Sequence, residues 1–423
     1  MTLLNRRTFI AGGLAAPLLG CSVSPDRAYS TSLAKYSVRN PHAGYFDHAA
    51  RRAILQTSND PVIQKARRRI EQKLPTCRAA MNIPVQDQFI DLPSFYGDRA
   101  KWNWAVTPFR DFEDAVSSLA AANLMTGDRS HADCLITLVR QWAESNALSK
   151  FGYNQKQSKQ GWYQIESTLF AIGFAIAAVR PDIPDREPDI AYINEWLVRV
   201  ARNHFDKRGE PNGTCCNNHY YRRCVYATII GIIADDDQLF REGCGAVFSA
   251  LDHATREGAL PLEMKRGELA AHYQNYAVMY LAMIAHLAEQ QGYPMFDLEI
   301  KGQTLHHLIA LNNRIIANPK TVTQFSGTSD ISYKYRKDKQ YFSWFEMYLA
   351  RFDNPQMEAW IRDKRALYNR SLGGHMTAYF YAAKPGNSVA TKDTRAAPPP
   401  QGRFVKVPGT NGDDQAPTYQ LKF

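Results

Sequence analysis

The sequence predicts an all-α fold, an incomplete α/α toroid of antiparallel helical hairpins around a deep cleft. Apolar residues recur at three- and four-residue spacing along most of the chain, which is the period of an amphipathic helix. Clusters of Pro, Gly, Asp and Asn separate these segments, and signals for β-strands are sparse. Helices joined by such short connections become antiparallel neighbours, and a long series of them suits a toroid.

The helical segments follow one another closely. In order, the predicted helices span residues 49–73, 107–126, 129–147, 162–179, 189–205, 218–234, 236–257, 266–291, 301–317, 338–352 and 356–370. The connections at residues 126–128 and 234–237 are short and polar, so the helices that they join should lie side by side. The polar stretch 318–339 is long enough to border the cleft.

One domain, residues 41–383, contains all of these helices, since a chain of this length can bury a single large core. Residues 21–40 are expected to be a tether. Residues 384–423 form a tail rich in Pro and Gly that cannot pack as a helix. We expect this tail to be partly disordered, with the alternative that its apolar pieces, 404–405 and 419–423, return to the body.

Residues 1–20 have the features of an export signal. Two adjacent arginines precede an apolar run of small residues, as in a twin-arginine signal peptide, which predicts a periplasmic protein. This run is too short to span a membrane, and later apolar stretches such as 165–179 are amphipathic or interrupted by Gly. The residues that end at Cys21 resemble a lipoprotein processing site. Cys21 is therefore either an acylated membrane tether or the start of a soluble product.

Charge indicates the kind of partner. The formal net charge is +10, and it is +8 after removal of residues 1–20, which contain two arginines and no acidic residue. A basic exported protein suits a polyanion. Nucleic acid is not expected, because no nucleic-acid-binding motif appears and the basic run 67–69 fits the solvated face of a helix. We therefore expect a monomer that binds an acidic polysaccharide.

Two segments concentrate residues that can carry chemistry. The string CCNNHYY contains Asn218 and His219, where a helix is predicted to begin. The string LPLEMKRGELAAHYQNY contains Arg266 and Tyr273, seven residues apart, which a continuous helix would place on one face. Each of these residues taken alone is more often structural, but the two segments together indicate a site.

These strings resemble the signatures NNHxYW and LPxExxRGxRALHYHNYAL of a polysaccharide lyase family, the periplasmic mannuronate-specific alginate lyases. The resemblance runs over residues 92–374, which is most of the mature chain. It implies the same α/α toroid. It also implies that Asn218, His219, Arg266 and Tyr273 are the catalytic set.

A second group of side chains flanks this set. The resemblance places Tyr96 on a mobile lid over the cleft. Basic side chains in these regions are suited to the carboxylates of a uronate chain, and aromatic ones to stacking on sugar rings, although core packing is the commoner role of a Trp. The expected substrate-binding residues are Tyr96, Arg99, Lys101, Trp162, Asn217, Arg222, His272 and Asn275, with Trp102, Trp104 and Arg223 in the same regions.

The chain departs from the family strings at three places. Arg222 stands where the family has Trp, Gln274 stands where it has His, and the lid region lacks the family's string rich in Ser and Lys. Polymannuronate is thus the default substrate. Another polyuronate, such as polyglucuronate or a heteropolymer that contains glucuronate, is the alternative.

The chemistry of elimination across C4 and C5 of a uronate requires these residue types. Removal of the C5 proton leaves a carbanion whose charge spreads onto the carboxylate. Arg266 and the Asn218 amide are suited to stabilise it, and donors of this kind contribute about 3 to 4 kcal/mol each. In β-mannuronate the proton and the leaving group share one face of the ring, so Tyr273 can serve as base and then as acid, with its pKa lowered by Arg266.

His219 then has one of three roles: it holds the carboxylate, it holds the Tyr273 proton, or it is the base for substrates of opposite C5 configuration. No metal or organic cofactor is required, because Arg266 and Asn218 already stabilise the charge. No Cys or His string has the spacing of zinc ligands.

The chain has seven cysteines, and an even number remains once Cys21 is set aside. The resemblance implies two disulfides, Cys77 with Cys134 and the vicinal pair Cys215 with Cys216. The other two, Cys224 and Cys244, fall in helical segments and are expected to be buried thiols.

Two further functions are alternatives to a lyase. In the first, the protein is a polymer-binding subunit of an export machine, whose cleft holds polymer without cutting it; Arg222 and the altered lid keep this alternative open. The second is a hydrolase that uses Glu263 and Glu346 as an acid pair, although no supporting motif surrounds them.

Overall fold

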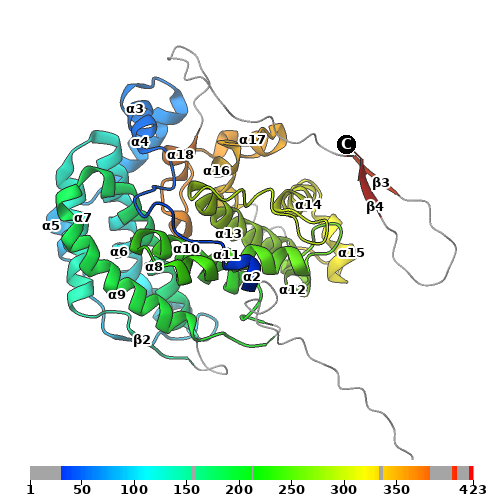
Figure 1. The fold of residues 1–423 in the computed structure, drawn as a ribbon, viewed down its shortest axis with the longest axis horizontal. Coiled ribbons are helices and arrows are strands. Elements are labelled where there is room, and N and C mark those ends of the chain that lie inside the picture. Colours follow the sequence, from blue (N-terminus) through cyan, green and yellow to red (C-terminus); the bar gives the residue numbers. More distant parts are fainter. Residues whose placement is uncertain are drawn as a thin grey trace, which may run out of the picture.

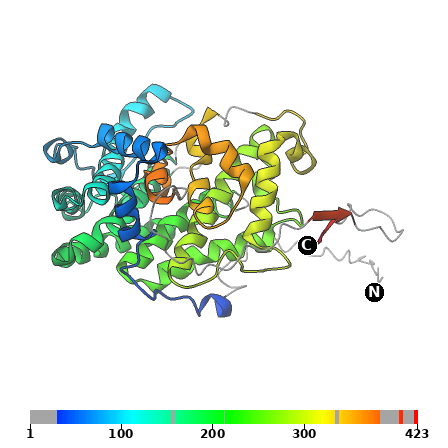
Figure 2. The ribbon, with the colours of Figure 1, turned by 90° about the horizontal axis from the view of Figure 1, so that it is seen from above.

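Long antiparallel helices form a body of two layers (Figures 1 and 2). The computed structural model describes residues 30–153, 159–211, 213–332, 337–381, 403–406 and 419–422. The inner helices are α6 (Arg99–Thr126), α8 (Gln160–Val179), α10 (Asn218–Ala234) and α13 (Ala270–Gln290), and the outer ones are α7 (Arg129–Glu144), α9 (Glu187–Phe205), α11 (Asp237–His253) and α14 (Leu305–Ala317). This arrangement confirms the predicted all-α, incomplete α/α toroid.

The two layers differ in how their helices are buried. Helices α8 and α10 are buried on nearly every side, whereas α7 and α9 in the outer layer bury one face and expose the other. Helix α11 is buried continuously over residues 243–251 and is exposed only near its ends. Helix α8 is the one described helix long and apolar enough to cross a membrane by composition, and 89% of that stretch is buried inside the protein. It therefore has the surroundings of a core helix.

Local capping sets where the helices begin and end. Gly127 and Asp235 both adopt the left-handed conformation, with φ of 75° and 56°, and end α6 and α10. The next residue in each case, Asp128 or Asp236, caps the following helix through its side chain. Each pair of helices is thus joined by two residues, which confirms the predicted short connections.

Shorter elements complete the fold. The remaining helices are α2 (Ser30–Leu33), α3 (His48–Thr57), α4 (Pro61–Lys73), α5 (Cys77–Met81), α12 (Pro261–Met264), α15 (Thr323–Ser326), α16 (Phe345–Leu349), α17 (Pro355–Ile361) and α18 (Met376–Phe380). The 3-10 turns are η1 (Arg180–Asp182), η2 (Pro184–Arg186), η3 (Gly267–Leu269), η4 (Pro319–Val322), η6 (Lys339–Phe342), η7 (Arg362–Lys364) and η8 (Arg370–Leu372). Strand β1 (Phe89–Ile90) pairs in parallel with β2 (Lys150–Phe151), and β3 (Arg403–Lys406) pairs antiparallel with β4 (Tyr419–Lys422).

Several predicted helices are wrong in extent: 356–370 is an α-helix only as far as Ile361, and 107–126 begins eight residues earlier, at Arg99. The segment 49–73 is two helices, because Asp60 and Pro61 begin a new one. The segment 266–291 begins its α-helix only at Ala270, after the turn η3. The segment 338–352 is a 3-10 turn followed by the short helix α16.

The two ends of the chain differ from the expected domain plan where they are described. Leu33 and Tyr36 are buried, and the backbone N–H of Asn40 donates to the Gln291 side chain at 2.9 Å, so the predicted tether is part of the body from Leu33 onward. The export signal 1–20 and Cys21 lie outside the described residues. In the tail, the described pieces are the paired strands β3 and β4, and the rest lies outside the described residues.

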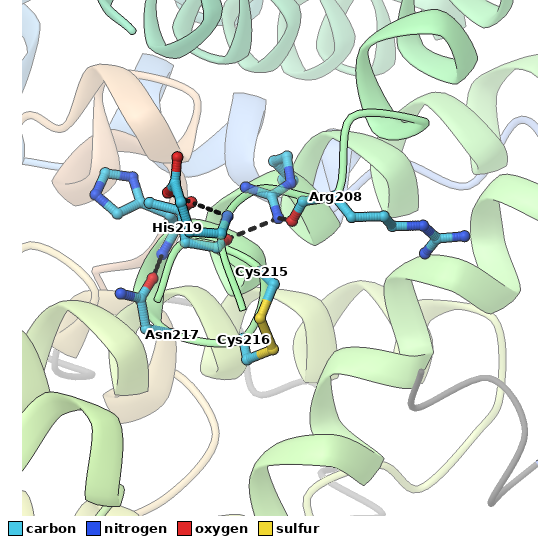
Figure 3. Close-up of a disulfide and its surroundings, with 8 residues drawn as sticks. Arg208, Cys215, Cys216, Asn217 and His219 are labelled. Carbon is cyan, nitrogen blue, oxygen red and sulfur yellow. Dashed lines mark hydrogen bonds between the residues drawn. A yellow bond between two sulfur atoms is a disulfide. The ribbon is translucent and has the colours of Figure 1, made fainter. Parts of the chain in front are cut away.

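Both predicted disulfides are present. Cys77 on α5 bonds to Cys134 on α7, and Cys215 bonds to Cys216 in the loop before α10 (Figure 3). The other two cysteines in the described ranges, Cys224 and Cys244, are buried thiols outside these disulfides, as expected.

The bond between Cys77 and Cys134 should make a large contribution to stability, because it closes a loop of 57 positions in the unfolded chain. By the chain-entropy model the loss of such a bond costs about 4 kcal/mol of the free energy of unfolding. Urea unfolding of the double variant Cys77→Ser/Cys134→Ser should therefore show a markedly lower midpoint than the wild type. An unchanged midpoint would show that the α5–α7 contact holds without the bond.

Candidate active site

A cleft of about 520 Å³ lies at the first turn of α10. Its walls come from α6, α8, α10, α13, the turn at Arg266 and η8, which are far apart in the sequence. The lining residues are Phe95, Tyr96, Trp102, Arg110, Glu113, Gln160, Tyr163, Gln164, Ser167, Thr214, Asn218, His219, Arg222, Arg266, His272, Tyr273, Tyr276, Tyr280, Gln340, Arg370 and Ser371. All four residues of the predicted catalytic set are among them.

The start of α10 holds two of these four. Asn217 caps the helix by accepting a hydrogen bond from the backbone N–H of His219 at 3.0 Å (Figure 3). Asn218 and His219 are therefore the first two helical residues, as the sequence predicted. Their side chains are held at a helix end that faces the cleft and not in the middle of the core.

His219 is a neutral imidazole in this setting. Its ring stacks on that of Tyr163, with centroids 4.4 Å apart. Burial lowers the pKa of His219 well below its ordinary value, and the charges of Arg222 and Arg223 lower it further. Its Nδ1 is buried and has no hydrogen-bond partner within the described ranges, so it is available to a ligand or a proton.

Arg266 and Tyr273 are in contact, but through a different local structure from the one that the sequence predicted. They do not share a continuous helix, because Arg266 lies in the turn between α12 and η3 and Tyr273 lies on the first turn of α13. The turn brings the guanidinium carbon of Arg266 over the Tyr273 ring, 3.7 Å from its centroid. The two side chains are thus in contact, and the helical-face argument for that contact was wrong.

The expected effect of Arg266 on Tyr273 is also corrected. Burial raises the pKa of Tyr273, and the Arg266 charge opposes that rise without cancelling it. Tyr273 is therefore a protonated phenol at neutral pH. In this state it is ready to donate a proton, whereas acting as a base requires that its own proton first move elsewhere.

Glu263 ties the two catalytic segments together. Its Oε1 accepts the backbone N–H of Asn218 at 2.5 Å, and the backbone N–H of Arg266 donates to the Glu263 carbonyl at 3.1 Å. The side chain is fully buried, and burial raises its pKa to about 8. Glu263 thus positions both segments as a largely neutral carboxyl.

This arrangement removes the support for a hydrolase. Neither Glu263 nor Glu346 lines the cleft. Glu346 is buried elsewhere, where Arg365 and the Thr377 hydroxyl donate to it at 3.0 Å and 2.6 Å. The two carboxyls do not form an acid pair across a substrate site.

The predicted substrate-binding residues divide into two groups. Tyr96, Arg222 and His272 line the cleft, and the Tyr96 side chain is 86% exposed at its mouth. Arg99 and Lys101 do not line it: Arg99 stacks on Phe95, 3.9 Å from the ring centroid, and Lys101 is exposed on the first turn of α6.

Three other residues predicted to bind substrate are outside the cleft lining. Trp162 is fully buried and stacks on His204 with centroids 5.4 Å apart, so it belongs to the core. Asn217 caps α10. Asn275 is fully buried, and its amide donates to the Tyr341 carbonyl at 2.8 Å, which fixes α13 to the turn η6.

Several residues that line the cleft were not predicted from the sequence. Arg370 approaches from η8 and donates two hydrogen bonds to Asp114, at 2.8 and 2.9 Å, and lies 3.4 Å from the buried carboxylate of Glu113. Burial raises the pKa of Glu113 to about 7. No local motif marks these residues, because α6 and η8 meet only in the folded chain. A pairing of distant positions in related sequences is the signal that could have found them.

The chain is similar in sequence to known proteins of one family. Residues 55–322 match the family model described as Alginate lyase. A protein of Stenotrophomonas maltophilia named Polysaccharide lyase is 27% identical and covers 64% of this chain and 79% of its own length. An alginate lyase of Pseudomonas syringae pv. tomato is 23% identical over 72% of this chain and 83% of its own.

Solved structures of alginate lyase A1-III, from Sphingomonas species A1, have a similar fold. A His→Ala variant complexed with tetrasaccharide has a TM-score of 0.71 and 28% identity, and covers 83% of this chain and 98% of its own. A Tyr→Phe variant complexed with tetrasaccharide has a TM-score of 0.69 at the same identity. An alginate lyase from Bacteroides ovatus, with 11% identity and a TM-score of 0.59, shares the fold.

The raised pKa of Glu263 should make stability depend on pH. The folded carboxyl holds its proton up to a pKa of about 8, whereas its ordinary value is 4.5, so the folded state binds more protons between these two values. The free energy of unfolding of the wild type should therefore fall as pH rises through this range, relative to Glu263→Gln, by up to about 1 kcal/mol per pH unit.

Urea unfolding at a series of pH values measures this difference. Glu268→Gln, which removes an exposed carboxylate two residues after Arg266, is the matched control and should run parallel to the wild type. Parallel curves for the wild type and Glu263→Gln would contradict a buried, protonated Glu263.

Proposed function

Because this chain belongs to the alginate lyase family, we propose that it cleaves polymannuronate, or a closely similar polyuronate, by β-elimination to leave 4,5-unsaturated uronate ends. The observation that carries the proposal is the meeting of Asn218, His219, Arg266 and Tyr273 in one cleft. The His and Tyr substituted in the two A1-III complexes are 54 positions apart, and so are His219 and Tyr273. The same pair of residue types at the same separation supports the same role.

The cleft is suited to bind a carboxylate at the reacting sugar. Arg266 supplies a guanidinium, and the Asn218 side chain, at the first turn of α10, supplies an amide. As the C5 proton leaves, negative charge moves onto the carboxylate oxygens. Donors already aimed at those oxygens stabilise the transition state more than the ground state.

Tyr273 and His219 carry out the proton transfers in this proposal. In β-mannuronate, Tyr273 takes the C5 proton as a phenolate and returns it to O4 as the C4–O4 bond breaks. Because burial raises the pKa of Tyr273, the resting phenol must first lose its proton. The neutral His219, whose Nδ1 has no partner within the described ranges, is suited to accept it.

The protein is proposed to act in the periplasm after export by its twin-arginine signal, with Cys21 as the point where a lipid would attach. An acidic exopolysaccharide passing through that compartment is the proposed substrate. The four arginines that line the cleft, Arg110, Arg222, Arg266 and Arg370, suit a polymer with a carboxylate on each sugar.

Tyr273→Phe should abolish elimination while the protein stays folded, because the phenol oxygen is the proposed proton carrier. The loss should exceed about 100-fold in kcat, as for removal of a general acid or base. The measurement is the growth of ultraviolet absorbance from the unsaturated product on polymannuronate, polyguluronate, polyglucuronate and hyaluronan. Tyr192→Phe, an exposed tyrosine on α9, is the matched control.

Wild-type activity should also rise from neutral to mildly alkaline pH, because the reactive phenolate forms as the pH approaches the raised pKa of Tyr273. Two results would contradict the proposal: silence of the wild type on all four polymers, or full activity of Tyr273→Phe. Retained polymer binding with no product would instead favour a subunit that holds polymer without cutting it.

A further inference from the structure

Arg222 lines the cleft but has no part in the elimination step. It lies three residues after His219 on α10, which places the two side chains on neighbouring positions of one helical face. Its side chain is 17% exposed, so the guanidinium is at the cleft wall and not in bulk solvent. A cation placed so close to the proposed proton acceptor requires an explanation.

Three groups on α8 fix the orientation of this guanidinium. Its Nε lies 3.3 Å from Oε2 of Glu166. Its Nη2 donates to the backbone carbonyl of Tyr163, at 3.3 Å, and to the hydroxyl of Ser167. Its Nη1 has no hydrogen-bond partner among the described residues. An arginine has five N–H donors in a rigid plane, so one edge is held by the protein and the other remains for a ligand.

Glu166 orients arginine side chains. It is fully buried and accepts no hydrogen bond within the described ranges. Among the described residues its ion-pair partners are Arg222 and Arg223. Arg223 already donates to the carbonyls of Arg208 and Thr214, at 3.1 and 2.9 Å. A buried carboxylate without hydrogen-bond donors is costly. The presence of this carboxylate beside Arg222 indicates that the orientation of the guanidinium is needed for ligand binding.

The expected ligand of Arg222 follows from the polymer. Every sugar of a polyuronate carries a carboxylate, and the carboxylate of the reacting sugar is held by Arg266 and Asn218. Arg370 is already paired with Asp114 through two hydrogen bonds. The Arg110 guanidinium lies over the Trp102 ring, 4.7 Å from its centroid. The next carboxylate along the chain therefore meets a guanidinium whose outer edge is unoccupied.

We propose that Arg222, held in place by Glu166 and Ser167, binds the carboxylate of the sugar adjacent to the one that is cleaved, and so restricts the enzyme to polymers with successive uronates. This inference rests on the proposed lyase function. It narrows the substrate class to homopolyuronates or blocks of contiguous uronates, and disfavours polymers in which uronates alternate with neutral sugars.

The test combines a variant with a modified substrate. The substrate is whichever polyuronate the wild type cleaves, in its intact form and after random reduction of many of its carboxyl groups to hydroxymethyl groups. On the intact polymer, Arg222→Gln should raise KM about 10- to 100-fold, the effect of losing a charge-assisted hydrogen bond, with a smaller change in kcat. On the reduced polymer, the wild type should lose this advantage and approach the variant.

Two further variants keep the test decisive. Arg222→Lys keeps the charge without the planar fork and should recover part of the KM. Arg68→Gln removes an exposed arginine on α4, away from the cleft, and controls for net charge. Thermal unfolding of each variant checks that it is folded.

Equal losses for Arg222→Gln on the intact and reduced polymers, or a loss confined to kcat, would overturn the assignment and make Arg222 a structural partner of Glu166. The outcome is separate from that of the proposed function, because it is read only where the wild type forms unsaturated product. A wild type without product on any polyuronate would reject both.

Discussion

Helix α10 must be buried on nearly every side while its first turn stays open to the cleft, and the rest of the structure is arranged around this constraint. Close packing against α11 depends on glycine: a Cβ at Gly231 would lie 2.6 Å from the Phe240 nitrogen, and one at Gly243 would lie 2.0 Å from the Thr228 hydroxyl. The axis of α10 is thereby fixed. Its N-terminal residues, Asn218 and His219, are then presented on a rigid element and not on a loop.

Features set by local sequence were predictable, and features set by tertiary contacts were not. The end of α6 before Gly127 and the start of α10 at Asn218 follow from neighbouring residues, so both positions were predicted correctly. The contact between Arg266 and Tyr273 depends on the turn η3, which interrupts the helical period. Trp162 was assigned to sugar stacking because exposed and core tryptophans look alike in a sequence, and only its packing against His204 distinguishes them.

Buried carboxyls surround a cleft whose exposed charges are positive. Burial raises the pKa of Glu113 and Glu166 to about 7 and that of Glu263 to about 8. Each accepts a hydrogen bond or faces an arginine, so it fixes the shape of the wall. Because these pKa values lie at or above neutrality, the groups are partly protonated near neutral pH and cancel the charge of the cleft arginines only in part. A polyanion thus meets a positive surface that is held in position by partly protonated acids.

Adjacent residues on α10 link the cleft wall to the loop that precedes the catalytic turn. Successive helical side chains point about 100° apart. Arg222 therefore faces the cleft, whereas Arg223 faces the loop and donates to the carbonyls of Arg208 and Thr214. That loop contains the disulfide between Cys215 and Cys216, directly before the capping residue. Both arginines share Glu166. A change in the charge or position of this one carboxyl therefore alters both the orientation of Arg222 at the cleft wall and the contacts of Arg223 with the loop before α10.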